Sequence, residues 1–317
     1  MWSTVIATGQ APFGYVEDRE TAMQVPAPLE YERATSVADA ITLLERLGDD
    51  ARIIAGGHSL LPMMKLRLVN PEYLVDINDL HEELGYIKRV GRQIRIGALT
   101  RHRELLESEE LKEHFPIFHD AERVIADPPV RNRGTLGGAL CQADSAEDLS
   151  SVCTTLNATC VIRGPNGERV VTMEQFYRGP YQTALEQAEM LIEIRIPIRP
   201  GGSNAYAKVD LRSGAWAVTA AGAALWLDRQ GRISDARVGL AAVGPSTTGI
   251  PEISKALRGR LPDAEGFDIA GRIAAESCQP VTDSRGSAAY KRHLAAELTR
   301  RTLATAQQRI VAGQGRR

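Results

Sequence analysis

The chain has 317 residues, of which 25% are charged, and its formal net charge is −2 at pH 7. Because positive and negative charges nearly balance, the composition gives no electrostatic case for a nucleic acid or an anionic membrane as partner. The longest apolar stretches, such as 217–227, are shorter than the roughly 20 residues that a membrane span requires, so no span is predicted. The chain is longer than those that usually fold around a single hydrophobic core, and we expect two or three lobes.

The first 22 residues, 1–22, show no hydrophobic periodicity, and we expect them to be an N-terminal extension that is not part of the fold. They also lack the basic start and sustained apolar run of a secretory signal. This pattern favours a cytoplasmic protein.

Residues 23–82 are predicted to form a first lobe in which helix and strand alternate on a small sheet. Apolar residues recur at helical spacing after Ser36, which is the expected N-cap, and Gly48 is the expected C-terminal stop. The elements predicted in this lobe are a helix at 36–48 and strands at 52–55 and 73–77.

Residues 83–200 are predicted to form a second lobe. Thr100 is the expected cap of its first helix, and Asn166 and Gly167 tolerate the positive φ of a tight hairpin turn. The elements predicted here are a strand at 93–100, a helix at 101–108, a hairpin at 160–171 and a closing strand at 189–198.

Residues 201–317 are predicted to form a C-terminal domain, joined to the second lobe by a linker at 199–204 that is rich in glycine and proline. The elements predicted in it are strands at 205–211, 217–228 and 233–244 and a final helix at 287–310.

The cysteines and histidines do not follow a metal-binding pattern. No two of the four cysteines have the two-residue spacing that iron–sulfur and zinc sites usually show, and the six histidines are scattered. We therefore predict no metal site and no catalytic residue in this chain.

Two paired-glycine loops carry the main chemical signal. The first, Gly56 and Gly57, ends an apolar strand and is followed by His58 and Ser59. Successive glycines let backbone N–H groups converge on a phosphate and let a bulky ligand approach the main chain. A tight turn between strand and helix is the more frequent explanation of a single Gly-Gly pair.

A second pair, Gly137 and Gly138, follows Thr135 and the cations Arg131 and Arg133. Two such loops facing each other across a cleft suit a dinucleotide with a central diphosphate. Neither loop has the spacing of a Rossmann fingerprint or a P-loop, which disfavours ordinary NAD and ATP sites. The carboxylates that follow, at 144, 147 and 148, suit ribose hydroxyls.

Three segments together resemble the FAD-binding medium subunit of molybdenum hydroxylases, most closely that of aerobic carbon monoxide dehydrogenases. They are AGGHSLLPMMKLR at 55–67, RNRGTLGGALCQAD at 131–144 and RGSAAYKRHL at 285–294. The fold class that the resemblance implies is α+β, with a two-lobed FAD-binding fold of the vanillyl-alcohol-oxidase/PCMH type and a C-terminal α/β domain.

Carried over residue by residue, the resemblance implies a set of FAD contacts: Ala55, Gly56, Gly57, His58, Ser59, Leu60, Thr135, Leu136, Gly137, Gly138, Asp148, Leu191, Lys208 and Trp216. Asp148 is expected at a ribose or the adenosine, and Leu191 on the adenosine side. Lys208 is expected near the flavin end. Trp216 is expected to cover one face of the isoalloxazine, although a core tryptophan is the competing interpretation. The family commonly has aspartate where this chain has Ala215.

The implied activity belongs to a complex. The resemblance implies non-covalent FAD in this chain, a small iron–sulfur subunit, and a large subunit with molybdenum cofactor and copper that oxidises carbon monoxide. FAD would pass the electrons to a quinone or another acceptor. A dimer of heterotrimers, cytoplasmic and associated peripherally with the inner face of the membrane, is expected.

Three alternatives stay open. The complex could act on an aromatic or N-heterocyclic substrate, because substrate choice lies in the large subunit. A flavin-free assembly subunit is a second alternative, for which Ala215 is the hint and the intact glycine loops are the counter-argument. A stand-alone flavin oxidase would need its own substrate pocket and base, and the sequence shows no constellation for either.

Overall fold

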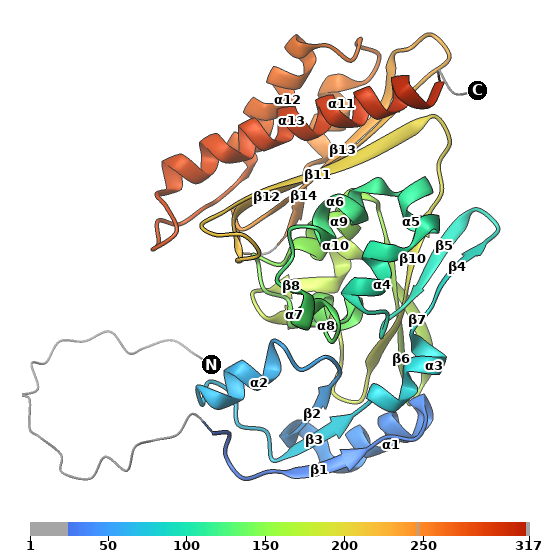
Figure 1. Cartoon of the computed structure of the whole chain (residues 1–317), viewed down its shortest axis with the longest axis vertical. Coiled ribbons are helices and arrows are strands. Elements are labelled where there is room, and N and C mark those ends of the chain that lie inside the picture. Colours follow the sequence, from blue (N-terminus) through green and yellow to red (C-terminus); the bar gives the residue numbers. More distant parts are fainter. Residues whose placement is uncertain (1–24, 246, 315–317) are drawn as a thin grey trace, which may run out of the picture.

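The computed structural model describes residues 25–245 and 247–314, so the expectation for 1–22 lies outside the described residues. Figure 1 shows three parts stacked along the long axis: a first lobe in blue, a second lobe mostly in green, and a C-terminal part from yellow to red. Each part contains a sheet with helices packed on it.

The first lobe is built on a three-stranded parallel sheet of order β1-β3-β2, with α1 packed against it. The predicted helix is confirmed, because the Ser36 hydroxyl accepts from the backbone N–H of Asp39 and Gly48 ends the helix at a φ of 67°. The elements of this lobe are β1 (Glu30–Arg33), α1 (Val37–Leu47), η1 (Gly48–Asp50), β2 (Ala51–Ile54), α2 (Leu60–Lys65), β3 (Tyr73–Asp76), η2 (Asn78–Leu80) and α3 (His81–Leu84).

The second lobe is built on a five-stranded antiparallel sheet of order β4-β5-β10-β6-β7. The predicted hairpin is confirmed as β6 and β7, with Gly167 at a φ of 104°. The strands are β4 (Ile87–Val90), β5 (Gln93–Gly97), β6 (Thr159–Gly164), β7 (Gly167–Thr172), β8 (Tyr177–Gly179), β9 (Gln182–Thr183) and β10 (Met190–Pro197). The helices are α4 (His102–Glu107), α5 (Glu109–His114), α6 (Pro116–Glu122), α7 (Pro128–Arg131), α8 (Leu136–Gln142), α9 (Asp148–Thr155) and α10 (Met173–Phe176).

The predicted cap at Thr100 is wrong. The Thr100 hydroxyl donates to the carbonyl of Tyr86, 3.0 Å away, and so it ties the loop after β5 to the segment that follows α3. The helix α4 begins at His102, and the Glu104 carboxylate accepts from the backbone N–H of Arg101 at 2.6 Å. The Thr100 side chain, which the local pattern assigned to the helix cap, therefore makes a tertiary hydrogen bond instead.

The C-terminal part is a four-stranded antiparallel sheet of order β11-β12-β13-β14, with the long helix α13 packed on β11 and β12. The predicted linker at 199–204 is too long, because β11 already begins at Gly202. A side chain at Gly202 would overlap with the indole of Trp226, which explains a glycine inside this strand. The elements are β11 (Gly202–Asp210), β12 (Ala217–Leu227), β13 (Ile233–Ala241), β14 (Thr248–Gly249), α11 (Pro251–Leu257), α12 (Ala264–Ser277) and α13 (Ala288–Gln314).

The second lobe and the C-terminal part share a hydrophobic core. Tyr206, Ala217 and Ala220 of the C-terminal strands are buried in the same cluster as the helices and sheet of the second lobe. Polar contacts join the same two parts, because Arg309 of α13 forms a two-pronged ion pair with Asp120 of α6 at 2.7 and 2.8 Å. These two parts therefore form one structural unit.

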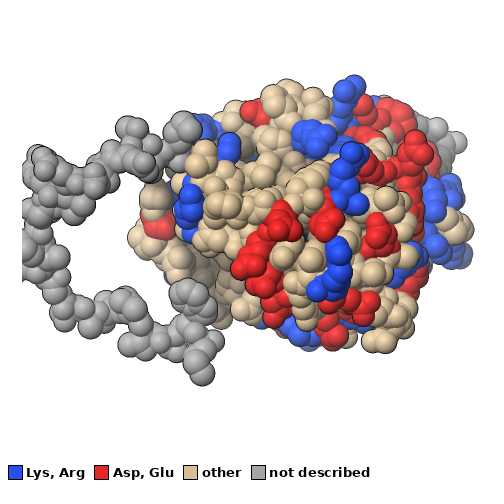
Figure 2. Space-filling model, turned by 90° about the horizontal axis from the view of Figure 1, so that it is seen from below, with Lys and Arg blue, Asp and Glu red and all other residues tan. Residues whose placement is uncertain are grey.

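Within residues 25–245 and 247–314, no helix is long and apolar enough to cross a membrane. The same described residues hold no group of three or more histidine, cysteine, aspartate or glutamate side chains arranged to hold a metal ion. Figure 2 shows acidic and basic side chains interspersed over the end of the molecule formed by the first lobe.

Candidate functional site

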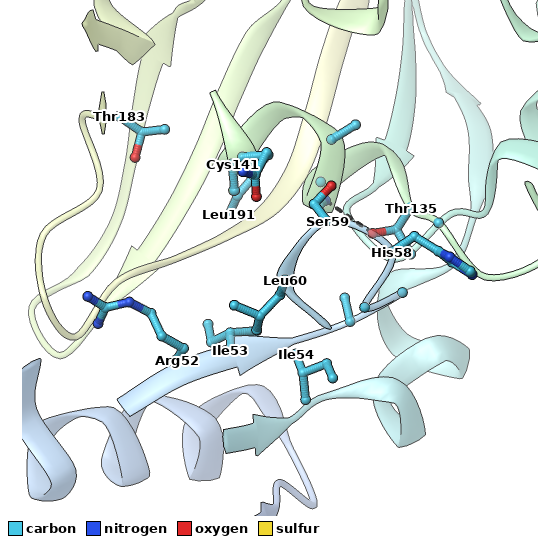
Figure 3. A pocket seen from close by; sticks show the side chains of 18 of the residues that line it. Arg52, Ile53, Ile54, His58, Ser59, Leu60, Thr135, Cys141, Thr183 and Leu191 are labelled. Carbon is cyan, nitrogen blue, oxygen red and sulfur yellow. Dashed lines mark hydrogen bonds between the residues drawn. The ribbon is translucent and has the colours of Figure 1, made fainter. Parts of the chain in front are cut away.

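A cavity of about 1040 Å³ lies between the two lobes. The first lobe contributes β2 and the loop that follows it, and the second lobe contributes the segment from 125 to 142 and the turns between β8 and β10. The C-terminal part contributes 214–216. Figure 3 shows His58, Ser59 and Thr135 close to one another, with Arg52 and Thr183 farther along the cavity. All three parts of the fold meet at this site.

The first glycine loop offers unused backbone donors to the cavity. It leaves β2 at Ile54, and Gly57 turns the chain at a φ of 78°, which residues with a Cβ rarely adopt. None of the described residues accepts a hydrogen bond from the backbone N–H of Gly57, His58 or Ser59. Such a turn with free N–H groups is suited to an anion.

Gly56 serves a different purpose, because it is where the two lobes touch. A Cβ on Gly56 would overlap with the carbonyl oxygen of Arg133 and lie 2.7 Å from the Cα of Gly134. Arg133 and Gly134 lead directly into the second glycine loop. The missing side chain of Gly56 therefore lets the backbones of the two loops come into contact.

The second glycine loop uses its backbone donors within the protein. The N–H groups of Leu136 and Gly137 donate to the carbonyls of Thr100 and Ala98, and that of Gly138 donates to the Thr135 hydroxyl at 3.1 Å. A Cβ on Gly137 would lie 2.7 Å from Ala98. Of this pair, Gly138 alone is exposed toward the cavity. Their similar sequences suggested that the two loops are equivalent donors. The structure shows that they are not.

Most of the residues that the resemblance selected line this cavity. They are Ala55, Gly56, Gly57, His58, Ser59, Leu60, Thr135, Gly137, Gly138, Asp148, Leu191 and Trp216. Leu136 does not, because it is fully buried in the core of the second lobe. Lys208 does not line it either.

Lys208 instead holds a wall of the cavity in place. Its ammonium, with only 1% of the side chain exposed, lies 3.1 Å from the Asp148 carboxylate and donates to the carbonyl of Ala215 at 3.1 Å. The Tyr206 hydroxyl donates to the other Asp148 oxygen. Burial raises the pKa of the Asp148 carboxyl above its usual range, and the Lys208 ammonium opposes that shift. Lys208 thus fixes both Asp148 and the loop at 214–216.

Glu147 is a carboxyl at the cavity wall that keeps a proton more readily than an ordinary glutamate. Burial, with the neighbouring Asp148 charge, raises its pKa to about 7. Its Oε2 accepts from the backbone N–H of Ser150 at 2.7 Å. The sequence placed Glu147 in an acidic group and gave no sign of this shift, because burial, its main cause, is a property of the folded chain.

His102 is a wall residue that the sequence did not single out. Its Nδ1 lies 3.1 Å from both oxygens of the fully buried Glu122, and its ring packs beneath Gly134. The Glu122 carboxylate raises the pKa of His102 against the effect of burial. A lone histidine after a strand carries no sequence signal, because Glu122 is 20 residues away along the chain.

The segment at 214–216 closes the end of the cavity next to Ala126. A Cβ on Gly214 would lie 2.6 Å from the carbonyl oxygen of Ala126. Trp216 is 44% exposed while lining the cavity, so it is not a core tryptophan. Its ring is therefore free to contact a ligand.

The residues present fit FAD. The cavity volume is at the upper end of the roughly 300–1,000 Å³ that ligand pockets span, as a dinucleotide requires. The free N–H groups at 57–59 are donors for a diphosphate, and Trp216 offers a flat apolar surface.

Comparison with known families agrees with this geometry. Residues 26–199 match the model of an FAD binding domain in molybdopterin dehydrogenase, and residues 204–306 match that of the CO dehydrogenase flavoprotein C-terminal domain. Together these matches cover most of the chain.

Individual relatives and solved structures are similar to this chain over most of its length. The carbon monoxide dehydrogenase medium chain of Hydrogenophaga pseudoflava is 38% identical over 88% of this chain and 97% of its own length. A solved Cu,Mo-CO dehydrogenase in its cyanide-inactivated form has a chain with a TM-score of 0.87 and 37% identity, covering 90% of this chain and 99% of that one. Quinoline 2-oxidoreductase from Pseudomonas putida 86 gives a TM-score of 0.84 and 33% identity over 90% and 99%.

Proposed function

We propose a function from one premise: this chain belongs to the FAD-binding medium subunits of CO dehydrogenase-type molybdenum hydroxylases, with FAD as its cofactor. Within that family we assign it to an aerobic, molybdenum-dependent carbon monoxide dehydrogenase. The observation that carries the assignment is one cavity walled by both glycine loops in a chain similar throughout to carbon monoxide dehydrogenase medium chains.

The proposed partners follow from the same membership. Relatives named as medium chains imply a small iron–sulfur subunit and a large subunit with molybdenum and copper, assembled as a dimer of heterotrimers. FAD, when bound, would collect electrons from the iron–sulfur clusters and pass them to an external acceptor such as a quinone. The protein supplies binding, orientation and the electrostatic environment. We place the complex in the cytoplasm, at the inner face of the membrane.

The first loop is proposed as the main phosphate-binding element. The N–H groups of Gly57, His58 and Ser59 are unused by the described residues and are near one another. The second loop is proposed to bound the ligand from the other side, with Gly138 bare toward the cavity and Thr135 adding a hydroxyl. This division of roles follows from the different hydrogen bonding of the two loops.

At the far end, Trp216 is proposed to lie against the isoalloxazine, which its exposure and position support. Lys208 is proposed to act through Asp148 and the Ala215 carbonyl, both of which it bonds. The Ala215 methyl group leaves no carboxylate at this position.

We propose that FAD is held without a covalent bond. Cys141 lines the cavity, but burial raises the pKa of its thiol to about 12, and the thiolate is the form that attacks. His58 is expected as a donor to the ligand.

A second candidate is a subunit of a complex that hydroxylates an aromatic or N-heterocyclic substrate. The similarity to quinoline 2-oxidoreductase supports it, because the fold of this subunit is nearly the same in both cases. A flavin-free assembly subunit is disfavoured, since the cavity and its donors are intact.

The test is to isolate the native protein with the chains that accompany it and to measure its metals and visible spectrum. Flavin bands with iron, molybdenum and copper, bleached by carbon monoxide, are expected. Flavin and molybdenum without bleaching by carbon monoxide would move the substrate to the second candidate. Absence of flavin would contradict the assignment.

A further inference from the structure

A network of hydrogen bonds at the back of the two glycine loops joins the lobes through Asn78. Asn78 follows β3 in the first lobe, and its Nδ2 donates to the carbonyl of Ala55 at 2.7 Å. Ala55 is the first residue of the first glycine loop. Asp76 orients Asn78, because its Oδ1 accepts from both the backbone N–H and the Nδ2 of Asn78, at 2.8 and 2.7 Å.

Arg101 completes the connection from the second lobe. Its guanidinium donates to the Oδ1 of Asn78 at 2.8 Å and to the carbonyl of Arg133. Both acceptors are neutral groups, so this half-buried cation holds two backbone segments together rather than neutralising a carboxylate. Arg133 adds a longer bond to the same Asn78 oxygen at 3.4 Å.

The two ends of this network are the points where the loops touch. The Arg133 carbonyl that accepts from Arg101 is also the atom that a Cβ on Gly56 would overlap. Ala55, which accepts from Asn78, is the neighbour of Gly56. The chain of bonds from Ala55 through Asn78 and Arg101 to Arg133 therefore spans the backbone contact between the loops.

We propose that Asn78 and Arg101 form an inter-lobe clamp that fixes the first glycine loop against the second and thereby sets how tightly the chain holds FAD. The proposal rests on the proposed role of the two loops in binding FAD. When the spacing between the lobes is fixed before binding, less conformational entropy is lost as a ligand is bound by both of them. Asn78 and Arg101 are thus positioning residues that do not line the cavity themselves.

The test is the rate of FAD release from the full chain, isolated with the chains that accompany it and followed by the rise of flavin fluorescence. Asn78→Ala and Arg101→Ala are each expected to speed release about tenfold, the effect of one typical buried hydrogen bond. The double variant is expected to release FAD about as fast as either single one, because both changes break the same connection. Arg101→Lys, which keeps one donor, is expected to release FAD at an intermediate rate.

Two matched controls separate the clamp from general loss of structure. Asn70→Ala removes an exposed asparagine of the first lobe, and Arg103→Ala removes an exposed arginine of α4. Both are expected to release FAD at the native rate. Asn78→Asp keeps the acceptor for Arg101 but loses the donor to Ala55 and to Asp76, and it is expected to release FAD faster than the native chain.

Release at the native rate in Asn78→Ala, Asn78→Asp and Arg101→Ala, with flavin lost in Gly138→Val, would overturn the clamp and leave the proposed loops standing. Independent, additive effects of the two alanine variants would also overturn it. Native release in Gly138→Val as well would overturn both the clamp and the loop assignment.

Discussion

The four loop glycines look interchangeable in sequence and perform different tasks in the structure. Gly57 supplies a positive φ, and Gly56 and Gly137 allow close backbone approach. Gly138 lines the cavity without a side chain, and a Cβ at this position would contact only the Thr135 hydroxyl, at 2.8 Å. The consequences of substitution should differ accordingly.

Gly138→Val is expected to lower the FAD content of the purified protein severely, with a smaller fall in the melting temperature. The branched side chain would enter the space assigned to the ligand, and its Cβ would displace the Thr135 hydroxyl, which lies 2.8 Å away and accepts from the Gly138 N–H. Flavin content after acid release is the measurement, with Gly313→Val at an open surface position as control. Full flavin retention in Gly138→Val would contradict the assignment of this loop.

Glu147 is expected to make stability depend on pH. Its pKa is about 7 in the folded chain against an ordinary 4.5, a difference equivalent to about 3 kcal/mol. Because the folded pKa is the higher one, this contribution is complete below pH 4.5 and is lost as the pH rises through 7.

Glu147→Gln keeps the acceptor for the Ser150 N–H and cannot ionise. Melting temperatures of the FAD-free chain should therefore fall more steeply for the native protein than for Glu147→Gln as the pH is raised from about 5.5 to about 8. Parallel pH profiles would show that Glu147 ionises without cost.

At the scale of elements, hydrophobic periodicity and turn residues correctly predicted those helices and turns that depend on local interactions. The helix after Ser36, the hairpin at Gly167 and the long C-terminal helix are all found. Errors arose where a distant residue competes with the local pattern. Thr100 bonds Tyr86 instead of capping α4, and the supposed linker at 199–204 enters a strand because Gly202 pairs with Trp226 of β12.

The cap of α1 offers a test of these local interactions. Ser36→Ala removes the acceptor for the Asp39 N–H and is expected to lower the free energy of unfolding by about 1 kcal/mol. Ser36→Asp retains an acceptor and should match the native protein. Denaturant unfolding measures both, and equal stability of Ser36→Ala would mean that the cap is dispensable.

At the scale of the whole molecule, most of the residues named from the motifs and the resemblance line the cavity, whereas His102 was missed and the different roles of the two loops could not be predicted. Which backbone donors remain free depends on Thr100 and Ala98, which the second loop contacts only in the folded chain. The same is true of His102 with Glu122 and of Lys208 with Asp148. These pairs are far apart in sequence and carry no shared pattern.

The shared core predicts that the second lobe depends on the C-terminal part. A fragment ending at residue 199 would leave out Tyr206, Ala217 and Ala220, which are buried in the core of the second lobe. It would also lose the Arg309–Asp120 ion pair. Such a fragment is expected to melt without a cooperative transition in calorimetry, and a sharp native-like transition would contradict this view.

FAD bound between the lobes, with the first loop as its main source of backbone donors, should change amide protection in a specific pattern. Hydrogen–deuterium exchange of the full chain with and without FAD measures that pattern. The amides at 57–59, unbonded to any described residue, are expected to exchange fast without FAD and to become protected with it. The amides at 136–138, already bonded within the protein, should change much less. Protection confined to other segments, or no change at 57–59, would contradict the proposed placement of FAD.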